Sequence, residues 1–518
     1  MAASTSSATN PHMPPSESGA LSGNVVVPVF SSSSSSSSSA PSPGPDSLSA
    51  AFGKHQLSLA SRSVHADDYI NNHQAVAPPL HVSTTYRYSD DPEQLVPWMN
   101  VNPAAPYDSH IYSRDSAPNT TRLEALLSSI IGAPCLTYAS GLAAFHAMLV
   151  FLNPKRIAIG GGYHGCHGVI QLVGRMSGLQ QLTLEELDTL EAGDVIHVET
   201  PLNPTGEARD MGYYAAKAAE KRCFLTVDAT FGPPPLFDPF RYKADLVMHS
   251  GTKYFGGHSD LLCGVLAVRP DHQKFNGTVG GRSGERDWVE DLKNERLYLG
   301  SVMGSLEGWL GVRSLRTLEL RVMRQSQNAQ RLVDWLAAGL VQEAAGTTKG
   351  GFEEGAGGGA DEAKNDSSSS SSGGDGVVSG LVLKIQHASQ QPEASDPNSW
   401  LCKQMPNGYG PVFAIWMKDP EDAKRLPSKL HLFHHATSLG GVESLIEWRA
   451  MTDKSMDKRL LRLSIGVEAW EDLKQDLLQG FRGLAAEKVV RKGEETTKGP
   501  EKVSTVDEQI LETPMVAS

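Results

Sequence analysis

The strongest constraint on the fold of this chain is a strand–helix–strand alternation near its middle. Residues 194–199 and 223–228 are short apolar runs typical of buried strands, and residues 211–221 between them have helical spacing. Two strands joined by a helix at this spacing favour a parallel sheet with helices packed on it. Further helices are expected at residues 121–131 and 140–152. The pattern therefore predicts an α/β fold built on a mainly parallel sheet.

Three polar segments interrupt or flank this pattern. Residues 1–54 are rich in Ser, Pro and Ala, and an insertion at about residues 346–378 is rich in Gly and Ser. Segments of this composition bury too little apolar surface to offset the entropy lost on ordering, so both are predicted to be disordered. The charged residues 487–518 are predicted to form a loose tail.

The rest of the chain is expected to form two domains. We predict a large α/β domain at residues 55–310 and a smaller α+β domain at residues 311–486. The smaller domain is expected because strand-like runs at residues 381–385 and 411–417 follow the insertion. A long helix, or two helices in line, is expected at residues 304–340.

Composition narrows the expected partners and compartment. The chain has 46 basic and 59 acidic residues and a formal charge of −13, which gives no support for binding nucleic acid or an anionic membrane. No apolar run reaches the roughly 18–20 residues of a membrane span. A cationic targeting segment requires Lys or Arg near the N-terminus, and no Lys or Arg precedes Lys54. A cytoplasmic protein is therefore expected. The five cysteines include no Cys-x-x-Cys pair, so neither a disulfide framework nor a metal site is indicated.

Lys253 is the first candidate for a catalytic residue. It lies in the segment Ser250-Gly-Thr-Lys253 after the apolar run 244–248, and is therefore expected in a loop at a strand end, where α/β sheets bind ligands. A lysine withdrawn from water has a lowered pKa and can form an imine with an aldehyde. The hydroxyls of Ser250 and Thr252 are suited to binding a phosphate. Taken alone, the pattern more often marks a surface lysine in a polar loop.

Three further positions add to this candidate site. Asp228 ends an apolar strand, where a buried carboxylate needs a partner such as a protonated ring nitrogen. Ser140 precedes a glycine and an apolar helix, and a helix N-terminus favours phosphate. Tyr163 follows Gly161 and Gly162, and its ring is suited to stacking on a flat cofactor. Taken singly, these residues also fit structural roles as a turn aspartate, a helix cap and a core tyrosine.

Nine short motifs follow one another along the chain: Tyr112-Ser-Arg114, Ala139-Ser-Gly-Leu-Ala143, Tyr163, Glu199-Thr-Pro-Leu-Asn-Pro-Thr205, Val227-Asp-Ala-Thr-Phe231, Ser250-Gly-Thr-Lys253, Gly257-His-Ser-Asp260, Ser438-Leu-Gly-Gly441 and Leu461-Arg-Leu-Ser-Ile-Gly466. In this order they resemble the trans-sulfuration enzymes, the Cys/Met-metabolism family that uses pyridoxal phosphate (PLP). The family includes cystathionine γ-synthases, γ-lyases and β-lyases, methionine γ-lyases and homoserine sulfhydrylases. The resemblance covers roughly residues 60–485, interrupted by the insertion.

The resemblance implies a type I PLP-dependent transferase fold and a homodimer or homotetramer with shared active sites. It implies that Lys253 holds the cofactor and moves protons during catalysis. It implies further that Tyr163 stacks on the ring and acts in catalysis, that Asp228 pairs with the ring nitrogen, and that Thr230 lies near the ring oxygen.

The resemblance also implies residues for the cofactor phosphate and for the substrate. The phosphate site would be formed within the chain by Ser140, Gly141, Leu142, Ser250 and Thr252. Tyr112 and Arg114 would reach the phosphate from the neighbouring subunit. The guanidinium of Arg114 is suited to donating two parallel hydrogen bonds to two phosphate oxygens. Arg462 would bind the substrate α-carboxylate, with Asn203 and Ser438 close to it.

The activity implied is γ-replacement or γ-elimination on homoserine-derived or sulfur-containing amino acids, of the cystathionine γ-synthase or γ-lyase type. Three alternatives stay open: cystathionine β-lyase-type elimination, another PLP reaction such as transamination, and a non-catalytic paralogue. Two departures from the family pattern lie near the expected substrate entrance. Thr437 stands where many γ-acting members carry Glu, and Asp453 replaces a usual His. These departures leave the natural substrate open.

Overall fold

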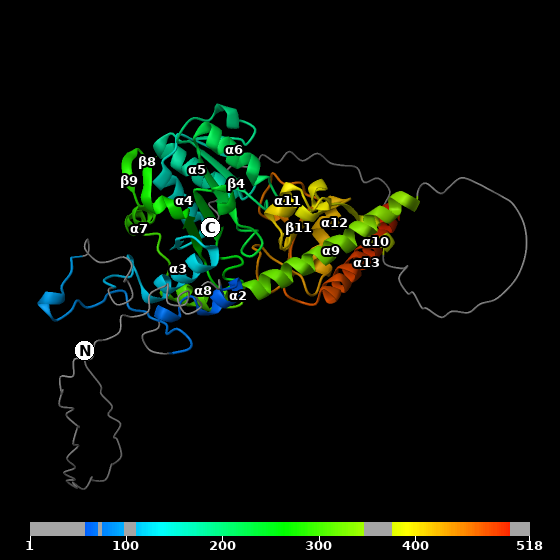
Figure 1. Cartoon of the computed structure of the whole chain (residues 1–518). Helices are drawn as coiled ribbons and strands as arrows, with labels where there is room; N and C mark the ends of the chain where they lie inside the picture. The colour runs from blue at the N-terminus through cyan, green and yellow to red at the C-terminus, as the bar shows by residue number, and fades with distance from the viewer. Residues whose placement is uncertain (1–56, 71–74, 98–109, 347–374, 498–518) are drawn as a thin grey trace, which may run out of the picture. The chain divides into compact units, whose positions relative to one another are not determined.

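The computed structural model describes residues 57–70, 75–97, 110–346 and 375–497 (Figure 1). Its larger sheet has seven strands in the order β1-β7-β6-β5-β4-β2-β3. β7 is antiparallel to both of its neighbours, and the other adjacent pairs are parallel, so the predicted mainly parallel sheet is confirmed. The strands are β1 (Cys135–Tyr138), β2 (Arg156–Ile159), β3 (Gln180–Leu182), β4 (Val195–Glu199), β5 (Phe224–Asp228), β6 (Leu246–Ser250) and β7 (Gly264–Val268).

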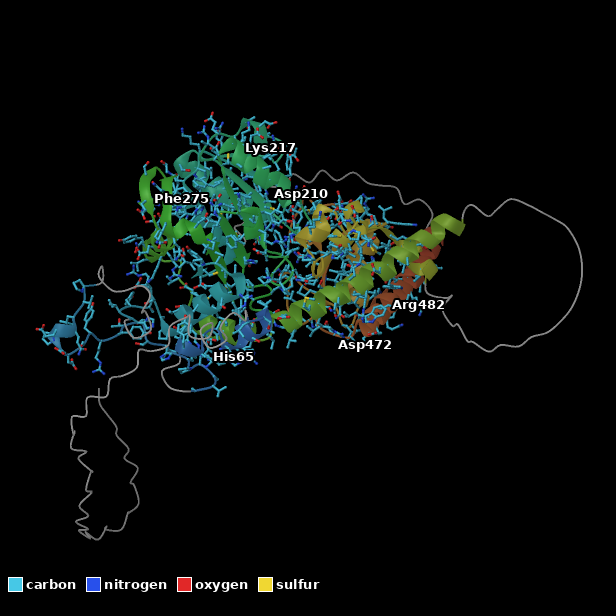
Figure 2. All side chains as sticks on the ribbon, viewed as in Figure 1. His65, Asp210, Lys217, Phe275, Asp472 and Arg482 are labelled. Carbon is cyan, nitrogen blue, oxygen red and sulfur yellow. The ribbon has the colours of Figure 1, made fainter. Side chains whose placement is uncertain are left out.

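Alternate residues along these strands pack into two hydrophobic cores, one on each face of the sheet. In β6, Leu246 and Met248 belong to one core and Val247 to the other, because successive side chains of a strand point to opposite faces. Helices cover both faces: α4 (Gly141–Leu152), α5 (His164–Ser177) and α7 (Trp288–Leu299) on one, α3 (Pro118–Ile131), α6 (Met211–Lys221) and α8 (Ser305–Leu315) on the other. Asp210, labelled in Figure 2, caps α6 by accepting a hydrogen bond from the backbone N–H of Gly212.

The register of the central strands brings several polar residues to one edge of the sheet. Glu199 at the end of β4 pairs with Asp228 at the end of β5, and Asp228 pairs in turn with Met248 of β6. Ser250 ends β6. Since parallel strands end on the same side, the sheet collects these side chains where α/β folds bind ligands.

The smaller sheet has five strands in the order β10-β11-β14-β13-β12, antiparallel except for the pair β12 and β13. One hydrophobic core joins its inner face to two long helices, α9 (Leu318–Gly346) and α13 (Trp470–Thr497), and to the short α10 (Asp375–Leu381). The strands are β10 (Val382–Gln386), β11 (Val412–Met417), β12 (His434–His435), β13 (Leu445–Trp448) and β14 (Leu460–Ser464). The predicted C-terminal α+β arrangement is therefore confirmed.

The remaining elements are short. A hairpin is formed by β8 (Phe275–Val279) and β9 (Arg282–Arg286), and the other α-helices are α2 (Leu59–His65), α11 (Trp400–Gln404) and α12 (Pro420–Arg425). The 3-10 helices are η1 (Asp68–Ile70), η2 (Pro92–Gln94), η4 (Leu187–Thr189), η5 (Pro239–Tyr242), η6 (Pro270–Lys274), η7 (Ala388–Gln390), η8 (Pro392–Ser395), η9 (Leu426–Lys429) and η10 (Arg449–Met451). Within the described ranges, no helix combines the length and apolar character needed to cross a bilayer.

The structure corrects two of the predicted segment boundaries. The loose tail predicted at 487–518 is wrong for residues 487–497, which continue α13, because Lys488 and Arg491 pair with the buried Asp422. The disordered insertion predicted at about 346–378 is wrong at its end, where α10 buries Val378 in the smaller core. Residues 1–56, 347–374 and 498–518 lie outside the described residues. The long helix expected at 304–340 is two helices in line, α8 and α9.

Candidate active site

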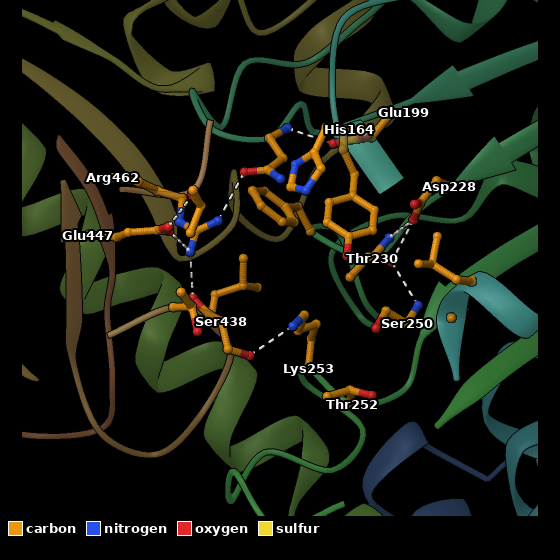
Figure 3. Close-up of a pocket in the computed structure, with 18 of the residues that line it drawn as sticks. His164, Glu199, Asp228, Thr230, Ser250, Thr252, Lys253, Ser438, Glu447 and Arg462 are labelled. Carbon is orange, nitrogen blue, oxygen red and sulfur yellow. Dashed lines mark hydrogen bonds and ion pairs between the residues drawn. The ribbon is translucent and has the colours of Figure 1, made fainter. Parts of the chain in front are cut away.

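A cavity of about 690 Å³ opens between the strand ends of the larger sheet and the strands β13 and β14 (Figure 3). Twelve of the fourteen site residues predicted from the sequence line it: Ser140, Gly141, Leu142, Tyr163, Asn203, Asp228, Thr230, Ser250, Thr252, Lys253, Ser438 and Arg462. These residues come from segments more than 300 positions apart in the chain. The fold therefore brings nearly the whole predicted set into one pocket.

Two neighbouring carboxyl groups line this pocket, the buried Asp228 and the half-buried Glu199. Asp228 accepts hydrogen bonds from the backbone N–H and the hydroxyl of Thr230, at 3.0 and 2.5 Å. Burial raises the pKa of Asp228 and the hydrogen bonds from Thr230 oppose that shift. Burial, and then the charge of Asp228, raise the pKa of Glu199 to about 8. A buried carboxylate such as Asp228 is stabilised by a positive partner, which a protonated ring nitrogen would supply.

Lys253 lies in the turn that follows β6 and also lines the pocket. Its Nζ donates a hydrogen bond to the hydroxyl of Ser438 at 2.8 Å (Figure 3). Burial lowers the pKa of Lys253 to about 8, the Arg462 charge adds to the shift, and Glu447 opposes it. About one-tenth of an amine with this pKa is uncharged at pH 7, a far larger fraction than for an ordinary lysine. It is therefore a nucleophile and a base, unlike an ordinary exposed lysine.

The start of α4 forms a cradle of the kind that holds a phosphate. Ser140 caps the helix, with its hydroxyl accepting from the backbone N–H of Ala143 at 3.1 Å. A side chain at Gly141 would lie 3.0 Å from the Cβ of Ser250, so only glycine leaves this space open. Backbone N–H groups at a helix start bind anions. These residues fit the phosphate group of PLP.

Tyr112 and Arg114 are the two predicted residues that do not line the pocket of their own chain. Arg114 instead donates to the backbone carbonyl of Leu297 at 3.0 Å, and its guanidinium lies 5.3 Å from the centre of the Tyr112 ring. Neither residue was expected in its own chain's pocket, because the family resemblance assigns them to the neighbouring subunit. That assignment stays a prediction.

The third region of the pocket is built around Arg462 on β14. Its guanidinium donates to the side-chain carbonyl of Asn203 at 3.1 Å and to the backbone carbonyl of Ser438 at 2.7 Å. It also forms an ion pair with Glu447, which lies opposite Arg462 in the β13–β14 register. Burial lowers the pKa of Arg462 to about 10, and Glu447 opposes that shift. Arg462 therefore stays cationic at physiological pH and suits a carboxylate.

Several pocket residues were not found by the sequence reasoning. Glu199 accepts from the backbone N–H groups of Tyr163 and Asn203, both at 2.7 Å, and so ties together the loops that carry them. The sequence contains a pattern that could have identified Glu199, since Glu199 ends a buried strand just as Asp228 does. Glu447 and Arg449 also line the pocket, together with the aromatic His164. Glu447 could have been noticed as an acidic residue within an apolar run.

Comparisons with known proteins agree with this geometry. A family model described as Cys/Met metabolism PLP-dependent enzyme matches residues 60–343 and 382–482, more than half of the chain.

Three relatives are each 28% identical to this chain. They are cystathionine gamma-lyase of Saccharomyces cerevisiae (82% of this chain, 97% of the relative), cystathionine beta-lyase of Lactococcus lactis (79% and 94%) and cystathionine gamma-synthase of Escherichia coli (83% and 98%). A crystal structure of cystathionine gamma-lyase from yeast matches with a TM-score of 0.64 and 25% identity, over 83% of this chain and 99% of that one. Similarity alone does not select one of these activities.

Proposed function

Because this chain belongs to the Cys/Met metabolism PLP-dependent enzymes, we propose that it performs γ-replacement or γ-elimination on homoserine-derived or sulfur-containing L-amino acids. Its cofactor is PLP. The observation that carries the proposal is that Lys253, Arg462 and the buried Asp228 line a single pocket. This arrangement provides a base, a carboxylate-binding group and a partner for the cofactor ring.

We assign the cofactor contacts as follows. Asp228 would pair with the ring nitrogen, the ring of Tyr163 would stack on the cofactor, and Thr230 would lie near the ring oxygen. The start of α4, with Ser250 and Thr252, would hold the phosphate. When bound, PLP supplies an electron sink for a carbanion formed on the substrate.

The residues of the chain would then orient the substrate and move its protons. Arg462 binds the α-carboxylate by charge-assisted hydrogen bonds, and Asn203 holds the guanidinium in place. The amine of Lys253 removes the proton from Cα, gives that proton up, and as a neutral amine again removes one from Cβ, which the departure of a γ-substituent requires. Its amine is held by a hydrogen bond to the hydroxyl of Ser438, on the side of the pocket lining that also carries Arg462's partner carbonyl.

Tyr163 is suited to assist the leaving group. Burial raises the pKa of its phenol, so the hydroxyl stays protonated at neutral pH and donates rather than accepts a proton. Donation to the departing γ-sulfur or γ-oxygen would ease bond cleavage. After departure, addition of a thiol completes a replacement, and hydrolysis to a 2-oxo acid and ammonia completes an elimination.

One specific observation favours β-elimination as the second candidate. Thr437 lines the pocket where many γ-acting members carry Glu, so an acidic group of those members is missing. The same Lys253 and Arg462 would serve β-elimination, which needs only the Cα proton to be removed. The products distinguish the two: cystathionine yields cysteine and 2-oxobutanoate by γ-cleavage, but homocysteine and pyruvate by β-cleavage.

The first test is the visible absorption spectrum of the purified protein, with Lys253→Ala as the comparison. We expect wild type to carry a visible cofactor band and Lys253→Ala to lose it, because the amine links the cofactor to the chain. L-cystathionine, and separately O-acetyl-L-homoserine with L-cysteine, are then supplied and the products identified. A colourless wild type that stays colourless with added PLP would contradict the proposal and favour a non-catalytic paralogue.

A further inference from the structure

Three charged side chains meet in the part of the pocket lining where we place the substrate α-carboxylate. Glu447 of β13, Arg449 at the start of η10 and Arg462 of β14 are 3, 4 and 5% exposed, and all three line the cavity. Buried charges are costly unless they are paired. The pairing within this group therefore decides how much charge is left for a ligand.

One carboxylate serves both guanidiniums. An oxygen of Glu447 lies 2.5 Å from Nη2 of Arg462, its partner in the β13–β14 register (Figure 3). Nη1 of Arg449 lies 3.0 and 2.9 Å from the two oxygens of the same carboxylate. The hydroxyl of Thr452 joins the two groups, since it donates to Glu447 at 2.7 Å and accepts from Arg449 at 3.0 Å. Glu447 therefore contacts two cations.

The charges of this cluster of Glu447, Arg449 and Arg462 sum to one positive charge. Glu447 and Arg462 alone would form a neutral pair with little attraction for an anion. Arg449 supplies a second positive charge, and the resulting excess of one matches a single α-carboxylate. Lys253 does not enter this sum, because we assign its amine to the link with the cofactor.

Arg449 is arranged to act on Arg462 through Glu447. Every side-chain hydrogen bond that Arg449 makes to the described part of the chain comes from Nη1 and goes to Glu447 or Thr452. Burial lowers the pKa of Arg462, Glu447 opposes that shift, and the charge of Arg449 adds to it. The two guanidiniums are therefore close enough for their charges to interact across the carboxylate that they share.

We propose that Arg449 is a positioning residue that neutralises Glu447, so that Arg462 keeps its positive charge for the α-carboxylate of the substrate. This inference rests on the proposed function, in which Arg462 is the group that binds that carboxylate. The net charge of the cluster then sets the affinity for the α-carboxylate, and an exchange of residues that preserves this charge preserves the affinity.

The test compares two ligands that differ only in the α-carboxylate, L-norleucine and pentan-1-amine. Each is titrated into the holoenzyme and followed by the absorbance of the cofactor. Wild type should bind L-norleucine about 10-fold more tightly or better. Arg449→Gln makes the cluster neutral and should reduce this preference by about 10-fold, with the affinity for pentan-1-amine changed by less than about 3-fold. A merely structural role would weaken the binding of both ligands alike.

Two further variants keep the net charge of the cluster by different routes. Arg449→Lys keeps each charge, and the double variant Glu447→Gln with Arg449→Gln leaves Arg462 as the one charge. Both should keep the preference within about 3-fold of wild type, and both test the inference if Arg449→Gln does not fold. Arg459→Gln is the matched control, since Arg459 pairs with Asp457 and neither residue lines the cavity. It should keep the wild-type preference.

The inference is overturned if wild type lacks the preference, if Arg449→Gln weakens both ligands equally, or if neither charge-preserving variant retains the preference. Product analysis with L-cystathionine, and with O-acetyl-L-homoserine plus L-cysteine, reports on the γ-reaction separately. If the γ-products form but the preference does not depend on the charge of the cluster, the inference fails alone. If no γ-product forms but the preference follows that charge, the inference stands and the γ-reaction fails.

Discussion

The amine of Lys253 gives a prediction at the scale of a single residue. With a pKa lowered to about 8 by burial, it is mainly charged below pH 8 and mainly neutral above it. Only the neutral amine attacks an aldehyde. We therefore expect the rate at which apoenzyme takes up PLP to rise with pH, with a midpoint near 8 and a plateau above it. The rate is followed by the growth of the visible band after mixing at pH values from about 6 to 10.

A free lysine analogue separates the effect of the pocket from that of PLP itself. Nα-acetyl-lysine should show the same rise with a midpoint near its ordinary pKa of about 10.4. If the enzyme and the analogue titrate at the same pH, burial does not activate Lys253. The argument for an activated base would then be lost.

The sequence predicts the residues whose roles depend on local position. Asp228 and Ser140 are found because a strand end and a helix start are visible in a short stretch of sequence. Glu199 is missed although the same strand-end argument applies to it. Glu447 and Arg449 depend on the pairing of β13 with β14, which places Glu447 opposite Arg462, and no pattern within either strand specifies that register.

At the scale of elements, the alternation of strand and helix predicts the central fold well. β4, α6 and β5 lie within about a residue of their expected bounds, because short apolar runs and helical spacing are local signals. The end of α13 is not predicted. Its charged residues have the composition of a solvated tail. Their partner, Asp422 of α12, lies 66 residues before Lys488 in the chain, so no local pattern shows the contact.

Those contacts lead to a prediction about α13. Lys488 and Arg491 lie 2.5 and 3.3 Å from the carboxylate of Asp422, which is fully buried. Replacing both with Ala leaves a buried charge without a partner, and we expect the free energy of unfolding to fall by about 1–3 kcal/mol, since both cations are partly exposed. Arg482→Ala, at an exposed position of the same helix (Figure 2), should change it by less than about 0.5 kcal/mol. Equal stability of all three proteins in a denaturant titration would show that the pairs do not anchor the helix.

At the scale of the whole molecule, the residues that we assign to the phosphate within the described part of the chain include no cation. Ser140, Gly141, Leu142, Ser250 and Thr252 are uncharged. Arg114 is turned toward Leu297 instead. Residues 75–97 also expose Val76, Val82 and Tyr88, apolar side chains suited to a subunit contact. These observations support the expected dimer with shared sites, in which Arg114 of each chain serves the pocket of the other.

A shared site makes two inactive variants complement each other. Arg114→Ala is expected to disable the pocket of the neighbouring subunit, and Lys253→Ala that of its own chain. A mixed dimer therefore has one pocket that carries both defects and one that carries neither. With random pairing, half of the dimers are mixed and half of their sites are intact, so activity should recover to about a quarter of wild type. The two chains are co-expressed with different tags and assayed as a mixture, with each variant alone as the control. Activity no higher than that of the separate variants would mean that Arg114 acts within its own chain or not at the pocket.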